Sequence, residues 1–133
     1  MILDEAEVVK RMLTHLQQGG WTIQSWKMPH ETGVDIVATQ AGVRLEVEAK
    51  GEGSSRRGSA RYGQRFRPEQ VRHRIGEALL TTLATVTMDS RQVAIAVPDV
   101  LLYQRYMGPI LPRLRQLGII VCWVGESAVR ETR

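Results

Sequence analysis

Asp35, Glu48 and Lys50 are charged residues within GVDIVATQAGVRLEVEAKG, residues 33 to 51, a stretch that otherwise reads as β-strand. Two carboxylates that come close together repel each other unless a cation lies between them. Hard oxygen ligands suit Mg²⁺, which keeps several waters and favours phosphate-bearing substrates. A neighbouring lysine can activate a water and stabilise negative charge on a phosphate. These residue types therefore indicate metal-assisted chemistry on a phosphate.

A β-hairpin is the element that must bring these side chains together. Residues 34 to 40 and 43 to 50 predict two strands around a turn at Ala41-Gly42. Because side chains alternate along a strand, Glu48 and Lys50 share one face, and pairing of the two strands brings Asp35 near both. The same pattern also suits an amphipathic hairpin whose polar face lies in solvent. We prefer convergence because the predicted helices cover both faces of the sheet.

The remaining elements complete an α/β pattern. Apolar spacing predicts helices over residues 4 to 18 and 68 to 87, strands over 21 to 28, 92 to 97 and 119 to 124, and two short helices between 99 and 116; the polar tail from Gly125 is expected to fray. The order αβββαβαβ predicts one domain, residues 1 to 133, with a mixed β-sheet flanked by helices on both faces.

Positive charge is concentrated directly after Lys50. Residues 51 to 74 contain seven arginines and two glutamates, whereas the whole chain has a formal net charge of +4. Residues 51 to 66 carry four glycines and three serines without periodicity, which predicts a long loop. We expect this segment to contact a nucleic-acid backbone, although a solvated loop without a partner has the same composition. The expected contact residues are Arg56, Arg57, Arg61, Tyr62, Arg65, Arg67, Arg72 and Arg74, with Tyr62 and Phe66 able to stack on a base.

The pattern of Asp35, twelve intervening residues and then Glu48-Ala49-Lys50 resembles the PD-(D/E)xK nuclease superfamily, which has the restriction-endonuclease-like fold. The order of elements is similar over almost the whole chain, and Val34 stands where the motif name has proline. The resemblance implies that Asp35, Glu48 and the carbonyl of Ala49 bind Mg²⁺, for which Mn²⁺ can substitute. It also implies that Lys50 positions or activates the attacking water.

Two further residues match polar positions of that superfamily. Glu5 lies on the apolar stripe of the first predicted helix, and Holliday-junction-resolvase-like members carry a glutamate there that faces the metal. Gln70 lies in the first turn of the second long helix, where many members have a glutamine near the lysine or the water. For each, a structural role remains open: Glu5 as an acid favoured by the helix dipole, and Gln70 as a solvent-facing residue. His73 is a weaker candidate for phosphate contact, and Glu46 is expected to pair with Arg44 or a helix residue.

Several classes of protein do not fit the sequence. The only cysteine, Cys122, permits no internal disulfide and is expected to be a buried thiol, which favours a reducing, cytoplasmic setting. MILDEAEVV is unlike a signal peptide, and no apolar run is long enough to span a membrane. The segment GEGSSRRG lacks the pattern of a phosphate-binding NTPase loop.

The sequence therefore predicts a Mg²⁺-dependent nuclease that hydrolyses phosphodiester bonds, with DNA as the expected substrate. A nucleic-acid-binding module on the same fold, with weak or lost catalysis, is the first alternative. An interaction protein with a buried ion cluster is the second. A homodimer is compatible with cleavage of two strands, but no interface is indicated by the sequence.

Overall fold

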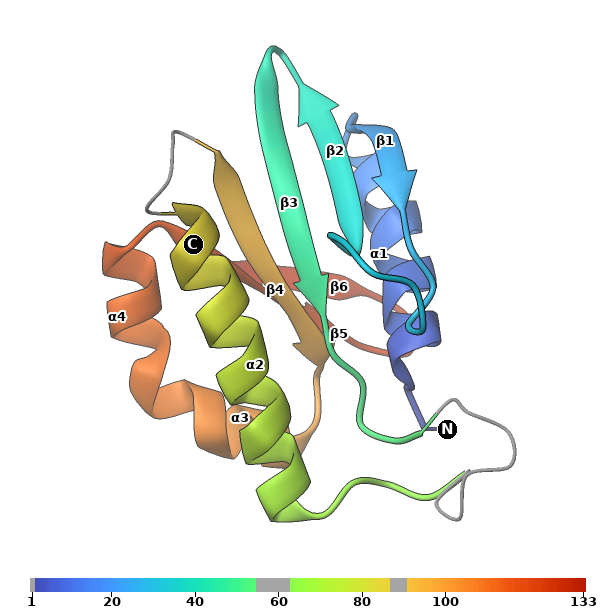
Figure 1. The fold of residues 1–133 in the computed structure, drawn as a ribbon, viewed down its shortest axis with the longest axis vertical. Helices are drawn as coiled ribbons and strands as arrows, with labels where there is room; N and C mark the ends of the chain where they lie inside the picture. The colour runs from blue at the N-terminus through green and yellow to red at the C-terminus, as the bar shows by residue number, and fades with distance from the viewer. Residues whose placement is uncertain (1, 55–62, 87–90) are drawn as a thin grey trace.

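A computed structural model describes residues 2–54, 63–86 and 91–133. The described elements, in chain order, are α1 (Glu5–Gln18), β1 (Thr22–Trp26), β2 (Ile36–Gln40), β3 (Val43–Ala49), α2 (Pro68–Val86), β4 (Gln92–Pro98), α3 (Leu101–Met107), a 3₁₀ turn η1 (Gly108–Ile110), α4 (Leu111–Gln116), β5 (Ile119–Val124) and β6 (Val129–Thr132). They form the predicted α/β arrangement (Figure 1). None of the helices in these ranges combines the length and the apolar character needed to cross a bilayer.

The sheet contains six described strands in the spatial order β1-β2-β3-β4-β5-β6. Strands β1 to β3 pair antiparallel, β3, β4 and β5 pair parallel, and β6 returns antiparallel to β5. Ala41 and Gly42 both have positive φ, at 51° and 79°, as the two central residues of a type I′ hairpin turn require. The predicted hairpin and the predicted mixed sheet are therefore confirmed.

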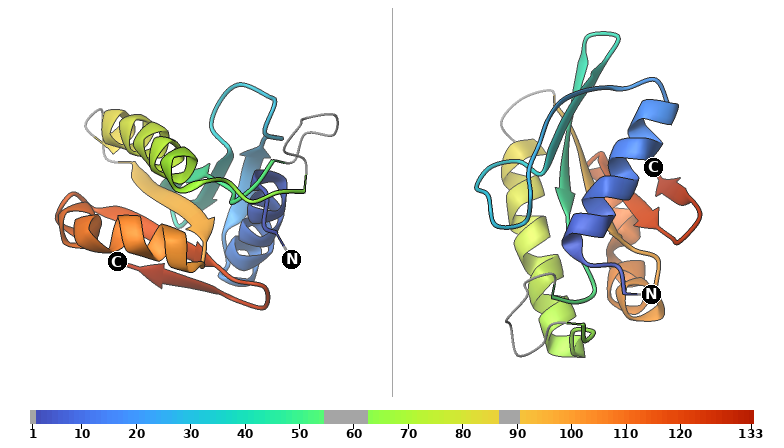
Figure 2. Two further views of the ribbon diagram at one scale, coloured as in Figure 1. Left: turned by 90° about the horizontal axis from the view of Figure 1, so that it is seen from below. Right: turned by 90° about the vertical axis from the view of Figure 1, so that its right-hand side faces the viewer.

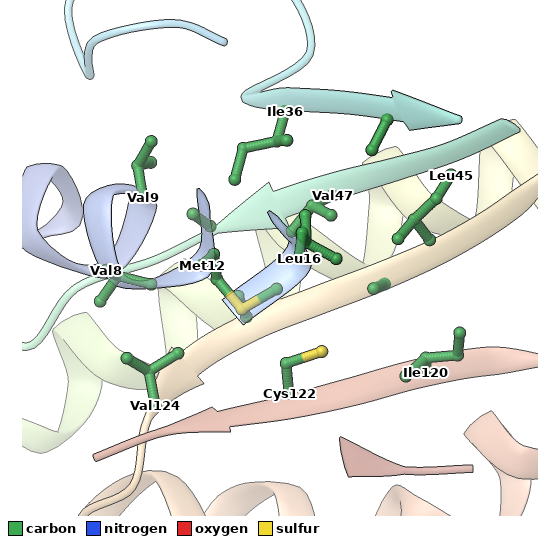
Figure 3. Packing of buried hydrophobic residues seen from close by; sticks show 14 of the residues in the cluster. Val8, Val9, Met12, Leu16, Ile36, Leu45, Val47, Ile120, Cys122 and Val124 are labelled. Atoms are coloured by element: carbon green, nitrogen blue, oxygen red, sulfur yellow. The ribbon is translucent and has the colours of Figure 1, made fainter. Parts of the chain in front are cut away.

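Two hydrophobic clusters hold helices against opposite faces of the sheet. One contains Val8, Val9, Met12 and Leu16 of α1 packed on β2 to β5, and Figure 3 shows Met12 and Leu16 among Val47 and Cys122. The other joins α2, α3 and α4 to β4 and β5. Figure 2 shows α1 and α2 on opposite sides of the strands. Both faces of the sheet are thus covered, and Cys122 is buried as predicted.

The strand β3 is apolar on only one of these faces. Leu45, Val47 and Ala49 belong to the cluster under α1. Their neighbours Glu46 and Glu48 pair in register with Val93 and Ile95 of β4, and both of those residues belong to the cluster under α2. Carboxylates therefore occupy positions on the α2 side where β4 places valine and isoleucine.

The chain after Gly125 does not fray, contrary to expectation. Val129–Thr132 forms β6, which pairs with β5 and places Arg130 beside Trp123. The guanidinium of Arg130 lies 5.0 Å from the Trp123 ring centre, and the indole Nε1 donates to Thr132 Oγ1 at 3.1 Å. The prediction was wrong because an edge strand with one solvated face has few apolar residues and so resembles a polar tail.

Gly51 is the closest point of contact between the end of β3 and the start of α1. A Cβ at this position would lie 2.3 Å from the main-chain nitrogen of Glu5 and 2.6 Å from the carbonyl carbon of Asp4. Such distances require the backbone of α1 to move. In contrast, a Cβ at Gly76, within α2, would meet nothing within 4 Å.

We expect Gly51→Ala to lower the free energy of unfolding by about 2 kcal/mol or more, because overpacking against backbone cannot relax by rotating a side chain. The matched variant Gly76→Ala should raise it by about 0.5–1 kcal/mol, since alanine is favoured over glycine inside a helix. Urea denaturation measures both. Wild-type stability of Gly51→Ala would contradict the close contact.

Candidate active site

The candidate site lies where the carboxyl ends of β3 and β4 approach the amino end of α1 and the side of α2 (Figure 1). Asp35 immediately precedes β2, Glu48 lies near the end of β3, and Lys50 directly follows β3. Glu5 is the first residue of α1. Three segments of the chain, the start of α1, the residue before β2 and the end of β3, therefore supply the charged groups at this edge.

Asp35 lies just outside β2, which begins at Ile36 and not at residue 34 as predicted. The β2–β3 register pairs Ile36 with Val47, so Asp35 and Glu48 are the next positions outward. Asp35 Oδ2 accepts the main-chain N–H of Ala49 at 2.8 Å. The Asp35 carboxylate thus accepts the Ala49 N–H, which would otherwise donate to a main-chain carbonyl if β2 extended further. Asp35 is buried, and burial raises the pKa of its carboxyl, while the Ala49 N–H and Lys50 act in the opposite direction.

Glu48 and Lys50 form an ion pair at the end of β3, as the alternation of side chains predicts. Lys50 Nζ lies 3.6 Å from Glu48 Oε1, and the side chains are 9% and 16% exposed. Burial, and then the negative charge of Asp35, raises the pKa of Glu48 to about 7, although Lys50 lowers it. The main-chain N–H of Lys50 donates to the carbonyl of Ala96 at 2.9 Å, which fixes this residue against β4. The charged pair is therefore held on rigid backbone.

Glu5 of α1 interacts electrostatically with the same group of charges. Its pKa is raised to about 7, first by burial and second by the charge of Asp35; Lys50 and Arg74 lower it. The first turn of α1 reaches this position because Gly51 permits the close contact described above. The N-cap of α1 is Asp4, whose Oδ1 accepts the N–H of Glu7 at 2.9 Å.

Glu77 of α2 is a site residue that sequence reasoning missed. Its Oε1 lies 3.9 Å from Lys50 Nζ and 3.8 Å from His73 Nε2. The sequence spacing could have identified Glu77, because it follows Gln70 by seven residues and so lies on the same face of α2. Glu77 extends the charged group from the sheet to the surface of α2, and half of its side chain remains exposed.

Gln70 begins the same face of α2. Its Oε1 accepts the main-chain N–H of Arg67 at 2.8 Å. Arg67 is the N-cap of α2 and Gln70 is the third helical residue, so this is the hydrogen bond that a glutamine makes in a capping box. Gln70 also lines a surface groove together with Glu69, His73, Arg74 and Glu77. Gln70 thus has a capping role and shares a groove on α2 with Glu77, which follows it by seven residues.

Glu46 is held by arginines on its own side of the sheet. Its Oε2 lies 3.2 Å from Arg44 Nε and 2.6 Å from Arg91 Nη1. This confirms the expected pairing with Arg44 and separates Glu46 from Glu48, although the two share a face of β3.

Four of the predicted nucleic-acid contacts, Arg56, Arg57, Arg61 and Tyr62, lie outside the described residues. The two ends of their loop are joined: Phe66 N–H donates to the carbonyl of Glu52 at 2.7 Å, and Gly53 bridges to Arg65. Arg65 lies 3.7 Å from Glu52, and Arg67 immediately precedes α2. The chain that leaves Lys50 therefore returns at Arg65 and Phe66 to pair with Gly53 and Glu52.

Arg72 and Arg74 lie over aromatic rings. The Arg72 guanidinium is 5.9 Å from the Tyr106 ring centre, and that of Arg74 is 4.7 Å from the Phe66 ring centre. Guanidinium groups in such positions remain charged and can still present N–H donors at their edges. The positive charge of Arg74 also lowers the pKa of Glu5, so Arg74 interacts electrostatically with the candidate site.

The donor set fits a hard divalent cation. Within residues 2–54, 63–86 and 91–133, no three His, Cys, Asp or Glu side chains are arranged around a common metal position. The predicted set instead has two carboxylates and the carbonyl of Ala49. The N–H of Ala49 points to Asp35, and the N–H and C=O of a strand residue face the same neighbour. A cation near Asp35 and Glu48 would also offset the negative charge of Asp35, which after burial is the next cause of the raised pKa of Glu48.

A scan against protein-family models, a search of curated proteins and a search of solved structures each found no significant match to this chain. The geometry of the site is therefore the basis of the functional argument.

We expect Glu48→Gln to change the pH dependence of stability. The pKa of Glu48 is about 7 in the folded chain against an ordinary value of 4.5, so between these values the folded state binds more protons and stability falls as pH rises. The variant should therefore lose less stability than wild type between pH 5 and pH 8, by on the order of 2 kcal/mol.

Urea denaturation at the two pH values in the absence of divalent metal measures this difference. Glu31→Gln, which changes an exposed carboxyl in the connection between β1 and β2, is the control and should follow wild type. A Glu48→Gln profile parallel to wild type would contradict the raised pKa.

Proposed function

We propose that this protein is a Mg²⁺-dependent nuclease that hydrolyses phosphodiester bonds of DNA, on the restriction-endonuclease-like variant of the α/β fold. The observation that carries the proposal is the convergence of Asp35, Glu48 and Lys50 at the carboxyl end of β3. The order of α1, the three antiparallel strands, α2 and β4 supports the proposed fold variant, as it agrees with the pattern that the PD-(D/E)xK resemblance implies.

Asp35, Glu48 and the Ala49 carbonyl would hold the metal ion, with Mn²⁺ as a substitute for Mg²⁺. The ion supplies positive charge that polarises a phosphate and makes a water a better nucleophile. Asp35 is already fixed by its bond with the Ala49 N–H, and burial excludes bulk water from its carboxylate. The ligands are therefore oriented before any substrate arrives.

Lys50 would orient the attacking water and balance the charge that develops on the phosphate. Its ammonium carries a positive charge into a recess where only 9% of the side chain is exposed, and electrostatic stabilisation is strongest where water is excluded. Glu5 is suited to accept or return a proton, because its carboxyl titrates near pH 7. Gln70 would help to orient the water from the start of α2.

Backbone phosphates would be bound by the arginines around the site. Arg65, Arg67, Arg72 and Arg74 belong to the described part, and Arg56, Arg57 and Arg61 are assigned to this role from sequence alone. Neutralised phosphates release counterions, so binding of this kind weakens steeply as salt concentration rises.

The alternative of a binding module with weak or lost catalysis has one observation in its favour. Lys50 lies between Glu48 and Glu77, at 3.6 and 3.9 Å, so its charge is balanced within the chain. A charged cluster of this kind can be structural. Salt-sensitive DNA binding without cleavage would support the alternative.

Purified protein with Mg²⁺ or Mn²⁺ should cleave at least one of supercoiled, linear, branched and single-stranded DNA. Lys50→Ala should lower the rate of cleavage by about 10²-fold or more, as for loss of a group that handles a proton, and should leave DNA affinity nearly unchanged. Gel analysis of cleavage and fluorescence anisotropy of binding test this.

Lys10→Ala is the control, as it removes an exposed lysine of α1 that lies beside the β5–β6 turn, and it should keep full activity. Bound Mg²⁺ should also raise the melting temperature of wild type, and Asp35→Asn should abolish that shift. The nuclease proposal fails if neither metal binds or supports cleavage, or if Lys50→Ala remains fully active.

A further inference from the structure

A small cavity opens directly beside the candidate active site. It has a volume of about 200 Å³ and lies where residues 51 to 53 approach the starts of α2 and α3. Its apolar walls are Phe66, Val71, Val100, Leu102 and Tyr103, and Glu52 and Arg65 complete its lining. Pockets for drug-sized ligands measure about 300–1,000 Å³, so this cavity is sized for a small ring system.

The cavity is rigidly connected to Lys50. The hydroxyl of Tyr103 donates to the carbonyl of Gly51 at 2.6 Å, one residue after Lys50. The main chain of Glu52 is fixed by two hydrogen bonds: its N–H donates to the carbonyl of Leu3 at 2.8 Å, and its carbonyl accepts the N–H of Phe66. A group in the cavity would therefore lie at a defined place relative to Lys50.

The walls combine stacking surface with charge. The Phe66 ring forms one wall, and the guanidinium of Arg74 lies 4.7 Å from its centre. The carboxylate of Glu52 is buried; its Oε1 accepts the N–H of Leu3 at 2.9 Å, and its Oε2 lies 3.7 Å from Arg65. Apolar and aromatic walls accept the faces of a flat ring. A carboxylate oxygen can accept hydrogen bonds from amino groups at the edge of such a ring.

We propose that this cavity, lined by Phe66, Leu102 and Glu52, binds an unpaired nucleobase of the strand whose phosphate lies at Asp35, Glu48 and Lys50. The phosphate part of this assignment rests on the proposed nuclease function. A base enters such a pocket only when it is unstacked, as in single strands, frayed ends or flipped nucleotides. The preferred substrate is therefore single-stranded or locally unpaired nucleic acid.

Charge favours a nucleic-acid strand over a neutral apolar ligand. Arg65 lies on the cavity lining and Arg74 against its aromatic wall, while Arg67 and Arg72 lie in or next to the first turn of α2. Cations around an apolar pocket suit a ligand with apolar faces and an attached phosphate. A base in a polynucleotide and a free nucleotide share this chemistry, and the experiment separates them.

The test uses methyl NMR of the full chain in EDTA, so that no cleavage is needed. Deoxycytidine 5′-monophosphate should shift the methyl resonances of Val71, Val100 and Leu102, and deoxyribose 5-phosphate should leave them unshifted. A single-stranded oligonucleotide should shift the same resonances at lower concentration than the mononucleotide, and a blunt duplex of equal length should not. Tighter binding of the mononucleotide than of the oligonucleotide would overturn the assignment to a polynucleotide strand.

Leu102→Trp fills the cavity, whereas Leu101→Trp adds the same side chain at the neighbouring position, which is 83% exposed. Leu102→Trp should weaken binding of the single strand at least about fivefold, since base stacking on an aromatic side chain contributes about 1–3 kcal/mol and 1.4 kcal/mol is tenfold. Leu101→Trp should bind as wild type. Phe66→Leu, which keeps an apolar wall without the ring, should also weaken binding, and unshifted methyl resonances of Val8 and Leu16 verify the fold of each variant.

The outcomes separate this inference from the nuclease proposal. If DNA is cleaved but neither nucleotide nor single strand shifts the cavity methyls, the base pocket is wrong and the nuclease proposal stands. If the methyls shift and Leu102→Trp weakens binding but no metal supports cleavage, the pocket stands and the protein is a binding module. Equal shifts with deoxyribose 5-phosphate would also overturn the pocket.

Discussion

The hydrogen bond from the Ala49 N–H to Asp35 Oδ2 is the constraint on which the arrangement of the site depends. It ends the β2–β3 ladder with a side chain, so the carboxylate of Asp35 is held at the open end of the hairpin, opposite the turn at Ala41-Gly42. Because the hairpin register is fixed by its two-residue turn, Glu48 then lies at the neighbouring position. Lys50 lies two residues after Glu48 at the end of β3, so its side chain extends from the same face and reaches the Glu48 carboxylate.

This concentration of charge is unfavourable for stability. Burial raises the pKa values of Glu5, Asp35 and Glu48, and the charge of Asp35 raises those of Glu5 and Glu48 further. Their ionised forms are therefore disfavoured in the folded chain. The cost is offset by the two hydrophobic clusters that clamp α1 and α2 to opposite faces of the sheet. An arrangement that lowers stability and yet is held on rigid elements is typical of functional sites.

The segment after Lys50 connects the charged site to the cavity beside it. Gly51 allows the start of α1 to approach, and the carbonyl of the same residue accepts the hydroxyl of Tyr103. Glu52 then joins Leu3 to Phe66 through its main chain. Two consecutive residues, Gly51 and Glu52, thereby connect the start of α1 on one side of Lys50 with the aromatic wall of the cavity on the other.

The hairpin, the helices and the charged residues at the end of β3 could be predicted from local sequence patterns. Strict alternation over residues 43 to 50 assigns Glu48 and Lys50 to one face, and Ala41-Gly42 sets the register, because both signals are local. The tertiary structure alone decided which distant groups reach that face. Glu77 approaches Lys50 through the packing of α2, and Gly51 acts through a contact with α1 that no local pattern encodes. Strand β6 likewise required its partner β5, since a solvated edge strand carries too few apolar residues to be recognised without the sheet that it completes.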